Sequence, residues 1–489
     1  MNSVNLADIF AGLAGRWPDR RAVVSPHLTL TYAQLLARAA QTARELQARG
    51  IGAGARVGIS LRDSAESVAS MLAIWMLGGT AVPIDFRMPL PERDRLAGEF
   101  ALGAIIEDRQ APAVGFQSIF AGPSWCDVIA QHATTPLWTD KKGGAPAMIS
   151  LSSGTTGQPV GFVLDHEAML FRSLFEPFHL IGVALLNTLP LSFSASRTYT
   201  FAALLQGSTV QFHPILSSPE ALREAVLQAK VTSVTAVPTT IRNLLELAGE
   251  RASPLFEGLR ALFAVGAPVP SAEKLMAMKF LCRNFVDGYG ASACGSISAL
   301  YGADVEANPD SVGRILTHVA VQIVDDRDEV LPPGQSGAIR VRSPGAASSV
   351  VGARSHGSGD TIKQGWAYPG DVGAIDDGGF LRLLGRTTDL IIRGGANVHP
   401  AEVEAVIAEH EGVREVAVVG FTHAREGEEI AAFVVPAGDL TELALMAHCR
   451  RRLAADKRPR RYIFLPELPR NANGKIVRTI LRQEAEKAV

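Results

Sequence analysis

The chain of 489 residues is longer than one hydrophobic core usually supports, so at least two domains are expected. Hydrophobic residues make up 47% of the chain and charged residues 20%, a balance that excludes a disordered protein. A net charge of −2 provides no broad field that would attract nucleic acid or anionic lipid, so neither is expected as a partner and small-molecule substrates are favoured.

The N-terminus contains Asp8 and Arg16 and lacks the basic-then-apolar pattern of a signal sequence, so a cytoplasmic location is expected. The longest uncharged run, residues 67–84, approaches the length of a short membrane span. A pair of glycines and Pro83 interrupt it, however. We therefore interpret this run as a helix, a turn and a buried strand, and we predict no membrane span.

Short apolar segments rich in β-branched residues alternate with helical patterns over most of the chain. Residues 55–60, 231–237 and 261–265 predict strands, and residues 218–228 predict one of the helices that lie between strands. No period of 20 to 50 residues recurs, which excludes a solenoid or a propeller. The alternation indicates one large α/β domain.

From about Asp371 the sequence changes to a turn-rich alternation of apolar and polar residues. Asp376-Asp377-Gly378-Gly379 separates two alternating segments and predicts a β-hairpin. Residues 400–407 predict a helix with proline in its first turn, and residues 415–420 and 430–435 predict strands. Together these segments predict a small α+β domain of about 100 residues.

We place the boundary between the domains near Thr387 and Thr388. The predicted organisation is a large α/β domain with several subdomains over residues 1–387 and a small α+β domain over residues 388–489.

Residues 152–161 form a run of small and hydroxyl-bearing residues, Ser-Ser-Gly-Thr-Thr-Gly-Gln-Pro-Val-Gly. In such a run, consecutive backbone N–H groups turn toward one point and cradle phosphate oxygens. No Gly-Lys-Ser/Thr closes the run, so it is not the P-loop of GTPases and kinase-like ATPases. Taken alone, the run is explained equally well by a nucleotide site or by a surface turn.

Further motifs follow, and their sequences and order resemble those of the acyl-adenylate-forming (AMP-binding) superfamily. Within it, the chain is most similar to the acyl-CoA synthetases. The motifs are residues 152–161, 266–268, 287–290, 368–371, 385–386, 393–400 and 468–475. The resemblance implies a large N-terminal domain and a small, mobile C-terminal lid domain. It also implies a lid that alternates between two half-reactions and activation of a carboxylic acid by ATP.

The resemblance also assigns residues to ATP. Residues 152–157 are similar to the loop that holds the β- and γ-phosphates, and the ring of Tyr289 offers a face for stacking on adenine. Asp371 is similar to the aspartate that accepts hydrogen bonds from the ribose hydroxyls, and Arg386 matches the arginine beside it. The implied ATP-binding residues are Ser152, Ser153, Gly154, Thr155, Thr156, Gly157, Gly266, Ala267, Pro268, Asp287, Gly288, Tyr289, Gly290, Ser292, Asp371 and Arg386.

The implied acid pocket is lined by Phe193, Ser194, Tyr199, Gly266 and Gly288. Members of the superfamily that activate amino acids usually have an aspartate where Ser194 stands. A buried ammonium left without such a partner is costly. An acid that lacks an α-amine is therefore favoured, although apolar residues such as Phe193 are equally compatible with a core.

Two further motifs are implied to act in the two half-reactions. Lys475 matches the catalytic lysine that stabilises negative charge while the carboxylate attacks the α-phosphate, with Arg386 as the second implied catalytic residue. Arg393, Gly394 and Gly395 resemble the loop along which the pantetheine arm of CoA passes, with Arg393 a candidate for the CoA phosphates.

Three positions depart from the family pattern. Val160 stands where the phosphate loop normally has a lysine, Ala293 stands where a magnesium-binding glutamate is usual, and Thr388 occupies the hinge position. The metal ligands are therefore unknown, although the resemblance implies ATP, Mg²⁺ and CoA as cofactors. Magnesium often keeps waters and relies on the phosphates of the substrate, so use of ATP at a lower rate remains compatible with Ala293.

The sequence thus favours an ATP-dependent carboxylic acid:CoA ligase that forms acyl-AMP and pyrophosphate and then transfers the acyl group to CoA. One alternative acceptor is the pantetheine of a carrier protein, or an amine. An alternative of another class is a nucleotide-binding protein with vestigial catalysis, which the residues at Val160 and Ala293 motivate.

Overall fold

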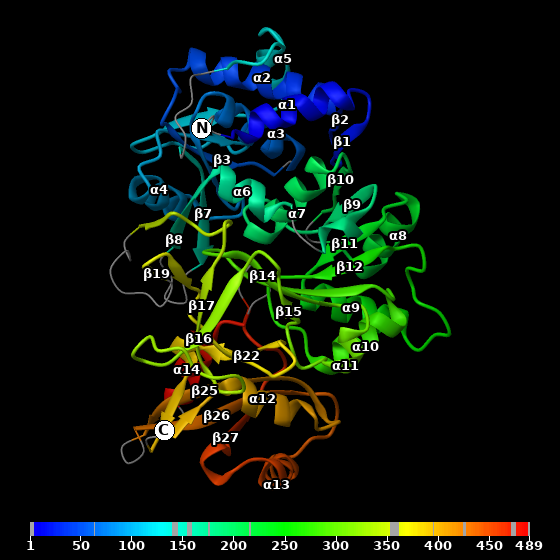
Figure 1. Ribbon diagram of the computed structural model, residues 1–489, viewed down its shortest axis with the longest axis vertical. Coiled ribbons are helices and arrows are strands. Elements are labelled where there is room, and N and C mark those ends of the chain that lie inside the picture. The colour runs from blue at the N-terminus through cyan, green and yellow to red at the C-terminus, as the bar shows by residue number, and fades with distance from the viewer. Residues whose placement is uncertain are drawn as a thin grey trace. The chain divides into compact units, whose positions relative to one another are not determined.

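The computed structural model (Figure 1) describes residues 4–62, 64–138, 145–153, 159–174, 177–214, 217–352, 361–394, 396–423, 427–470 and 476–487. Within these residues, one compact unit contains 4–153, 159–320 and 341–367, and a second contains 321–340 and the residues from 368 onward. The predicted boundary at 387/388 falls inside the second unit, so it remains a prediction about where one domain would move against the other.

A seven-stranded sheet in the first unit has the order β18-β8-β7-β4-β3-β5-β6. Its strands are β3 Arg56–Ser60, β4 Thr80–Pro83, β5 Ala104–Glu107, β6 Gln117–Phe120, β7 Pro146–Ser153, β8 Pro159–Asp165 and β18 Ser349–Val351. Helix α3 Ser64–Met76 connects the parallel strands β3 and β4. This helix and β4 account for the uncharged run 67–84, as predicted, and α4 Leu90–Glu99 connects β4 to β5.

A nine-stranded sheet in the same unit has the order β15-β14-β13-β12-β11-β9-β10-β1-β2. Its strands are β1 Arg21–Val24, β2 Thr29–Thr31, β9 Ala184–Asn187, β10 Thr209–Phe212, β11 Ser233–Ala236, β12 Ala261–Ala264, β13 Phe285–Ala291, β14 Gly295–Tyr301 and β15 Arg314–Ile315. The strands from β1 to β13 along this order are parallel, and the alternation of strands and helices that connects them confirms the predicted α/β class.

The remaining elements of the first unit surround or extend these sheets. They are α1 Leu6–Arg16, α2 Tyr32–Ala48, α5 Trp125–Ala130, α6 His166–Arg172, α7 Ser194–Leu205, α8 Pro219–Gln228, α9 Pro238–Ala248, α10 Ser271–Phe280, α11 Asp304–Ala307 and β19 Thr361–Lys363. Strand β20 Trp366–Tyr368 pairs through Ala367 with Val341 of β17 Gly337–Arg342. Among the described helices, none combines the length and the apolar character needed to cross a membrane.

The second unit is built on antiparallel hairpins. Strands β21 Asp371–Ile375 and β22 Leu381–Arg386 form the hairpin that the sequence predicted around Asp376, and β16 Ala320–Val324 precedes them in the chain. A five-stranded sheet has the order β24-β23-β26-β25, with β27 paired to β26. Its strands are β23 Ile391–Arg393, β24 Ala396–Val398, β25 Val413–His423, β26 Gly427–Pro436 and β27 Arg461–Phe464.

Helices cover both faces of this five-stranded sheet: α12 Pro400–Ala408 and α13 Glu442–Arg452 on one face, and α14 Arg478–Lys487 on the other. Because side chains alternate along a strand, Val418 of β25 packs in the first core while its neighbour Val419 packs in the second. This two-sided burial explains the nearly continuous apolar runs at residues 416–421 of β25 and 430–436 of β26.

Candidate active site

The predicted phosphate loop connects β7 to β8, which form an antiparallel hairpin. Ser152 lies opposite Val160 and Ser153 lies opposite Pro159 in the register of the two strands. Gly154, Thr155, Thr156 and Gly157, which the sequence assigns to the phosphates, lie outside the described residues. The structure therefore shows the two strands that hold the loop.

Two residues of the predicted acid pocket meet on the nine-stranded sheet. A Cβ atom built on Gly288 of β13 would lie 3.4 Å from the hydroxyl of Tyr199, so the tyrosine oxygen faces this glycine directly. Tyr199 is 5% exposed, and its ring centroid lies 4.9 Å from those of Phe178 and Phe263. Burial, together with the nearby carboxylate of Asp287, raises the pKa of Tyr199, so its hydroxyl stays protonated.

The other predicted residues here lie at the ends of neighbouring strands. Gly266, Ala267 and Pro268 follow the carboxyl end of β12, and Phe193 immediately precedes α7. In parallel sheets, ligands bind outside the carboxyl ends of the strands, which is where these glycine-containing turns lie. Residues 266–268 lie at such a strand end, and their contact with ATP or the acid stays a prediction.

Asp287 is engaged by a lysine that the sequence reasoning missed. Lys274 of α10 lies 2.8 Å from Asp287 Oδ2, and both side chains are 4% exposed. Lys274 Nζ also donates to the carbonyl of Ser311 at 2.7 Å. Burial raises the pKa of Asp287, and the ammonium of Lys274 opposes that rise. The carboxylate of Asp287 is therefore engaged within the fold by Lys274, and its backbone pairs with β12 and β14 in the sheet.

The hairpin of β13 and β14 carries Tyr289, Gly290 and Ser292. Its register shifts between Tyr289 and Gly290, and a Cβ atom on Gly290 would lie 2.6 Å from the carbonyl oxygen of Gly295. Only glycine fits so close an approach of two backbones. Tyr289 and Ser292 are half-buried, whereas Ala293 is 2% exposed.

Arg172 joins this hairpin to the predicted acid pocket. Its Nη2 donates to the carbonyl of Ser292 at 3.0 Å, its Nε donates to the carbonyl of Gly345 at 2.6 Å, and its Nη1 lies 3.4 Å from Ser194 Oγ. The guanidinium therefore touches one residue assigned to ATP and one assigned to the acid. The sequence reasoning missed Arg172, because it lies in a short helix with no motif of its own.

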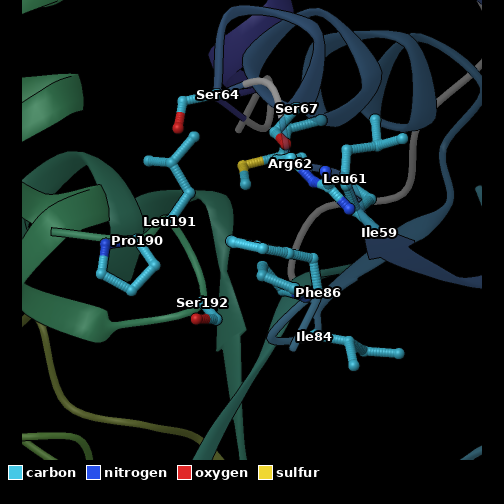
Figure 2. Close-up of a pocket in the computed structure, with 12 residues that line it drawn as sticks. Ile59, Leu61, Arg62, Ser64, Ser67, Ile84, Phe86, Pro190, Leu191 and Ser192 are labelled. Carbon is cyan, nitrogen blue, oxygen red and sulfur yellow. The ribbon is translucent and has the colours of Figure 1, made fainter. Parts of the chain in front are cut away.

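A separate pocket opens beside residues 190–192. Figure 2 shows Pro190, Leu191 and Ser192 on one side, with Ile59 and Phe86 among the residues on the other. None of the predicted acid-pocket residues lines it.

Asp371 and Arg386 come together within the second unit. They lie directly opposite each other on β21 and β22, and Arg386 Nε is 2.8 Å from Asp371 Oδ1. Arg386 Nη1 also donates to the carbonyl of Pro369 at 3.1 Å. Asp371 is 9% exposed, and its ion pair with Arg386 on the neighbouring strand holds the carboxylate in one orientation. The motif order named these two residues, and the strand register brings them together.

The guanidinium of Arg393 has internal partners. Nη1 donates to the carbonyls of Ala455, Asp456 and Arg458, and Nη2 lies 3.0 Å from the buried carboxylate of Glu429. The arginine thus holds residues 455–458 against the five-stranded sheet. Binding of CoA phosphates by Arg393 stays a prediction. Of the two glycines that follow, Gly394 is exposed and Gly395 lies outside the described residues.

Thr388, the predicted hinge, lies in the short 3₁₀ helix η2 Thr387–Asp389 and is exposed. Its neighbour Asp389 lies 3.5 Å from Arg478 of α14, and Arg478 also binds Glu404 at 2.6 Å. One arginine therefore ties the segment after Thr388 to α12 and α14.

Lys475 and residues 471–474 lie outside the described residues. The chain on either side is held by an antiparallel bridge between Arg470 and Ile476 and by a hydrogen bond of 2.8 Å from Val477 N to the carbonyl of Pro469. Arg470 is in turn paired with Glu415 at 2.7 Å. The residues on the two sides of 471–475 are therefore held next to each other.

The described residues do not supply a metal site at the position of the usual glutamate. The methyl group of Ala293 has no donor atom, and no group of three or more His, Cys, Asp or Glu among the residues that the structure describes is placed to hold a metal ion. Residue 293 therefore cannot provide the metal-binding carboxylate that is usual in the family pattern.

Comparisons with known proteins agree with these motifs. Residues 10–350 match the family of AMP-binding enzymes, and residues 402–475 match the AMP-binding enzyme C-terminal domain. A feruloyl-CoA synthase of Amycolatopsis is 31% identical, covering 96% of this chain and 98% of that protein. ATP-bound MatB from Rhodopseudomonas palustris has a TM-score of 0.89 at 27% identity, covering 99% of this chain and 100% of that one.

The o-succinylbenzoate CoA synthetase MenE of Bacillus subtilis, in complex with its acyl-adenylate intermediate, has a TM-score of 0.86 at 27% identity and covers 98% of each chain. The chain is thus similar to these proteins in both sequence and fold over nearly its whole length. The chain belongs to the family of AMP-binding enzymes.

Proposed function

We propose that the protein is an ATP-dependent carboxylic acid:CoA ligase. A carboxylate oxygen of the acid attacks the α-phosphorus of ATP, and pyrophosphate leaves as acyl-AMP forms. The thiolate of CoA then attacks the acyl carbonyl, and AMP leaves with the electron pair of the broken C–O bond. The observation that carries the proposal is similarity along almost the entire chain to a CoA synthase and to structures that hold ATP or an acyl-adenylate.

The first step requires positive charge and accurate placement. Two anions must approach, and charge accumulates on the departing pyrophosphate, so cations held near the phosphates stabilise the transition state more than the ground state. We assign that role to Lys475, and we assign Asp371 with Arg386 to the ribose. The ion pair of 2.8 Å supports the second assignment, because it pre-orients the carboxylate that would accept two hydroxyl hydrogen bonds.

The surroundings of Ser194 support an acid without an α-amine. Arg172 Nη1 lies 3.4 Å from Ser194 Oγ, so an ammonium group placed beside this hydroxyl would meet a buried guanidinium. Like charges at such a distance repel strongly where water is excluded. A neutral or anionic substituent on the α-carbon suits this site.

Mg²⁺ enters this proposal bound to ATP, since Ala293 offers no ligand and the ion binds readily through substrate phosphates and waters. We further propose that the C-terminal segment turns about Thr388 between the two half-reactions. We place the reaction in the cytoplasm, where ATP and CoA are both abundant.

A pyrophosphate-release assay tests the proposal. Purified protein is incubated with ATP and Mg²⁺ and a panel of aryl, alkyl and dicarboxylic acids, with and without CoA, and the thioester is identified by mass spectrometry. We expect pyrophosphate release that depends on the acid and a product heavier by the acyl group only when CoA is present. Omission of the acid is the control. Release from none of the acids, together with no ATP binding by calorimetry, would contradict the proposal.

A further inference from the structure

Two buried arginines in the first unit have no carboxylate partner. Arg172 is 3% exposed and Arg197 of α7 is 2% exposed. Arg197 Nη1 donates to the carbonyls of Leu191 at 2.7 Å and Ser192 at 2.6 Å, and its Nη2 donates to Ser150 Oγ. Among the described residues, no Asp or Glu forms an ion pair with either arginine. A buried cation without a counter-ion is costly, so this pair requires an explanation.

The pair retains its charge and has donors to spare. Burial lowers the pKa of Arg172 to about 10, and burial followed by the charge of Arg172 lowers the pKa of Arg197 to about 9, so both are cations at neutral pH. A guanidinium has five N–H donors. The described contacts leave Nε and one N–H of Nη2 free on Arg197, and one N–H each on Nη1 and Nη2 of Arg172.

Strand register relates Arg197 to the lysine that the phosphate loop lacks. In the hairpin of β7 and β8, Ser150 lies opposite Phe162 and Ser152 lies opposite Val160. Residues opposite each other, and residues two apart on one strand, share a face of the sheet. Ser150, which Arg197 binds, is therefore on the same face as Val160, about 7 Å further along the strand.

Arg172 approaches the same region from the other hairpin, because its Nη2 binds the carbonyl of Ser292, next to Ala293. The two arginines thus touch the strand that leads into the phosphate loop and the turn where the family pattern places its glutamate. The family lysine is absent at Val160 and the family carboxylate is absent at Ala293. A buried arginine contacts the hairpin that contains each of these residues.

We propose that Arg172 and Arg197 form an anion site for the phosphates of the nucleotide and supply the positive charge that a lysine at Val160 would otherwise provide. The ligand class is a polyphosphate: pyrophosphate or the triphosphate of ATP. This inference rests on the proposed ligase function. The two cations stabilise the negative charge that develops on pyrophosphate as it leaves, so the site acts on pyrophosphate binding and on the adenylation step.

Calorimetric binding of pyrophosphate and ATP to the full-length protein tests the site without requiring turnover. We expect R172Q and R197Q each to weaken binding roughly tenfold or more, the usual effect of losing a hydrogen bond to a charged group. The matched control is R56Q, because Arg56 also donates to a backbone carbonyl, that of Phe100 at 3.0 Å, but lies in β3, which contains none of the predicted phosphate residues. The control should bind both ligands as the wild type does.

Adding the lysine back distinguishes an electrostatic role from a structural one. If the pair replaces the lysine, V160K in the R197Q background should recover most of the lost affinity for pyrophosphate, since the two positions share one face. Unchanged affinity in both R172Q and R197Q would overturn the inference while leaving the ligase function intact. Absence of ATP binding by the wild type would instead refute the proposed function, and the inference with it.

Two other results would also support or overturn the proposed anion site. A change in KM for dicarboxylic acids with no change in pyrophosphate affinity would overturn the inference and assign the arginines to the acid. If the variants fail to fold, as judged by circular dichroism, a crystal structure of the wild type with pyrophosphate takes their place. A phosphate oxygen within about 4 Å of either guanidinium supports the site, and a pyrophosphate bound beyond that distance overturns it.

Discussion

Replacing Lys274 with methionine would leave the carboxylate of Asp287 buried without its cationic partner. At 2.8 Å and an effective dielectric constant of about 20, the attraction between the two charges is about 6 kcal/mol. The penalty is limited, because Asp287 escapes it by binding a proton. At pH 7, that proton costs about 4 kcal/mol for a group with an unfolded pKa of about 3.9. We therefore expect K274M to lower the free energy of unfolding by about 3–4 kcal/mol.

Tryptophan fluorescence during urea unfolding measures this loss of stability in the first unit. All five tryptophans, Trp17, Trp75, Trp125, Trp138 and Trp366, belong to the first unit, as does the ion pair. The matched control is K279M, because Lys279 is an exposed lysine on the same helix, and we expect a change within about 1 kcal/mol. The double variant K274M/D287L should recover most of the loss, since it removes both charges.

The pH dependence provides the sharper criterion. The pKa of Asp287 is raised in the folded protein, so its contribution to stability is fully present below the unfolded pKa and is lost as pH rises through the folded pKa. Without Lys274, the folded pKa rises further and this window widens. The defect of K274M should therefore shrink toward about 1.5 kcal/mol at pH 5. A defect below 1 kcal/mol at pH 7, or one independent of pH, would refute the reasoning.

Three further outcomes are expected. K475A should slow pyrophosphate–ATP exchange by about 10²–10³-fold and leave thioester formation from supplied acyl-AMP unchanged; equal loss in both steps would argue against a role confined to adenylation. D371N should raise KM for ATP roughly tenfold with KM for the acid unchanged, because it weakens the charged acceptor that Arg386 orients; steady-state kinetics measures both constants. R478A should speed hydrogen exchange in α12 and α14, because Glu404 loses its partner at 2.6 Å, without altering tryptophan-detected unfolding; unchanged exchange would contradict this.

The secondary structure near the motifs was predictable because its signals are local. The uncharged run at 67–84 contains a glycine pair between α3 and β4 and Pro83 at the end of β4, and the turn residues at 376–379 lie between β21 and β22. Hydrophobic periodicity and turn chemistry act over a few residues, so one sequence contains them in full.

The ion pairs and the buried cations were not predictable in this way. Arg172 binds the carbonyl of Ser292, 120 residues away in the chain, and no spacing in the sequence announces that contact. Arg393 is a second example, because nothing in its motif indicated that its guanidinium contacts the carboxylate of Glu429 and three carbonyls.

The sequence by itself determined the family, the order of the ATP motifs and the α/β class of the large domain, because these follow from residue types at short, fixed spacings. Only the tertiary structure decided that Lys274 pairs with Asp287 and that Arg172 and Arg197 stay buried without counter-ions. The physical reason is that charge pairing depends on distance and burial in space. Strand register and helix packing, which are set by the whole core, fix both.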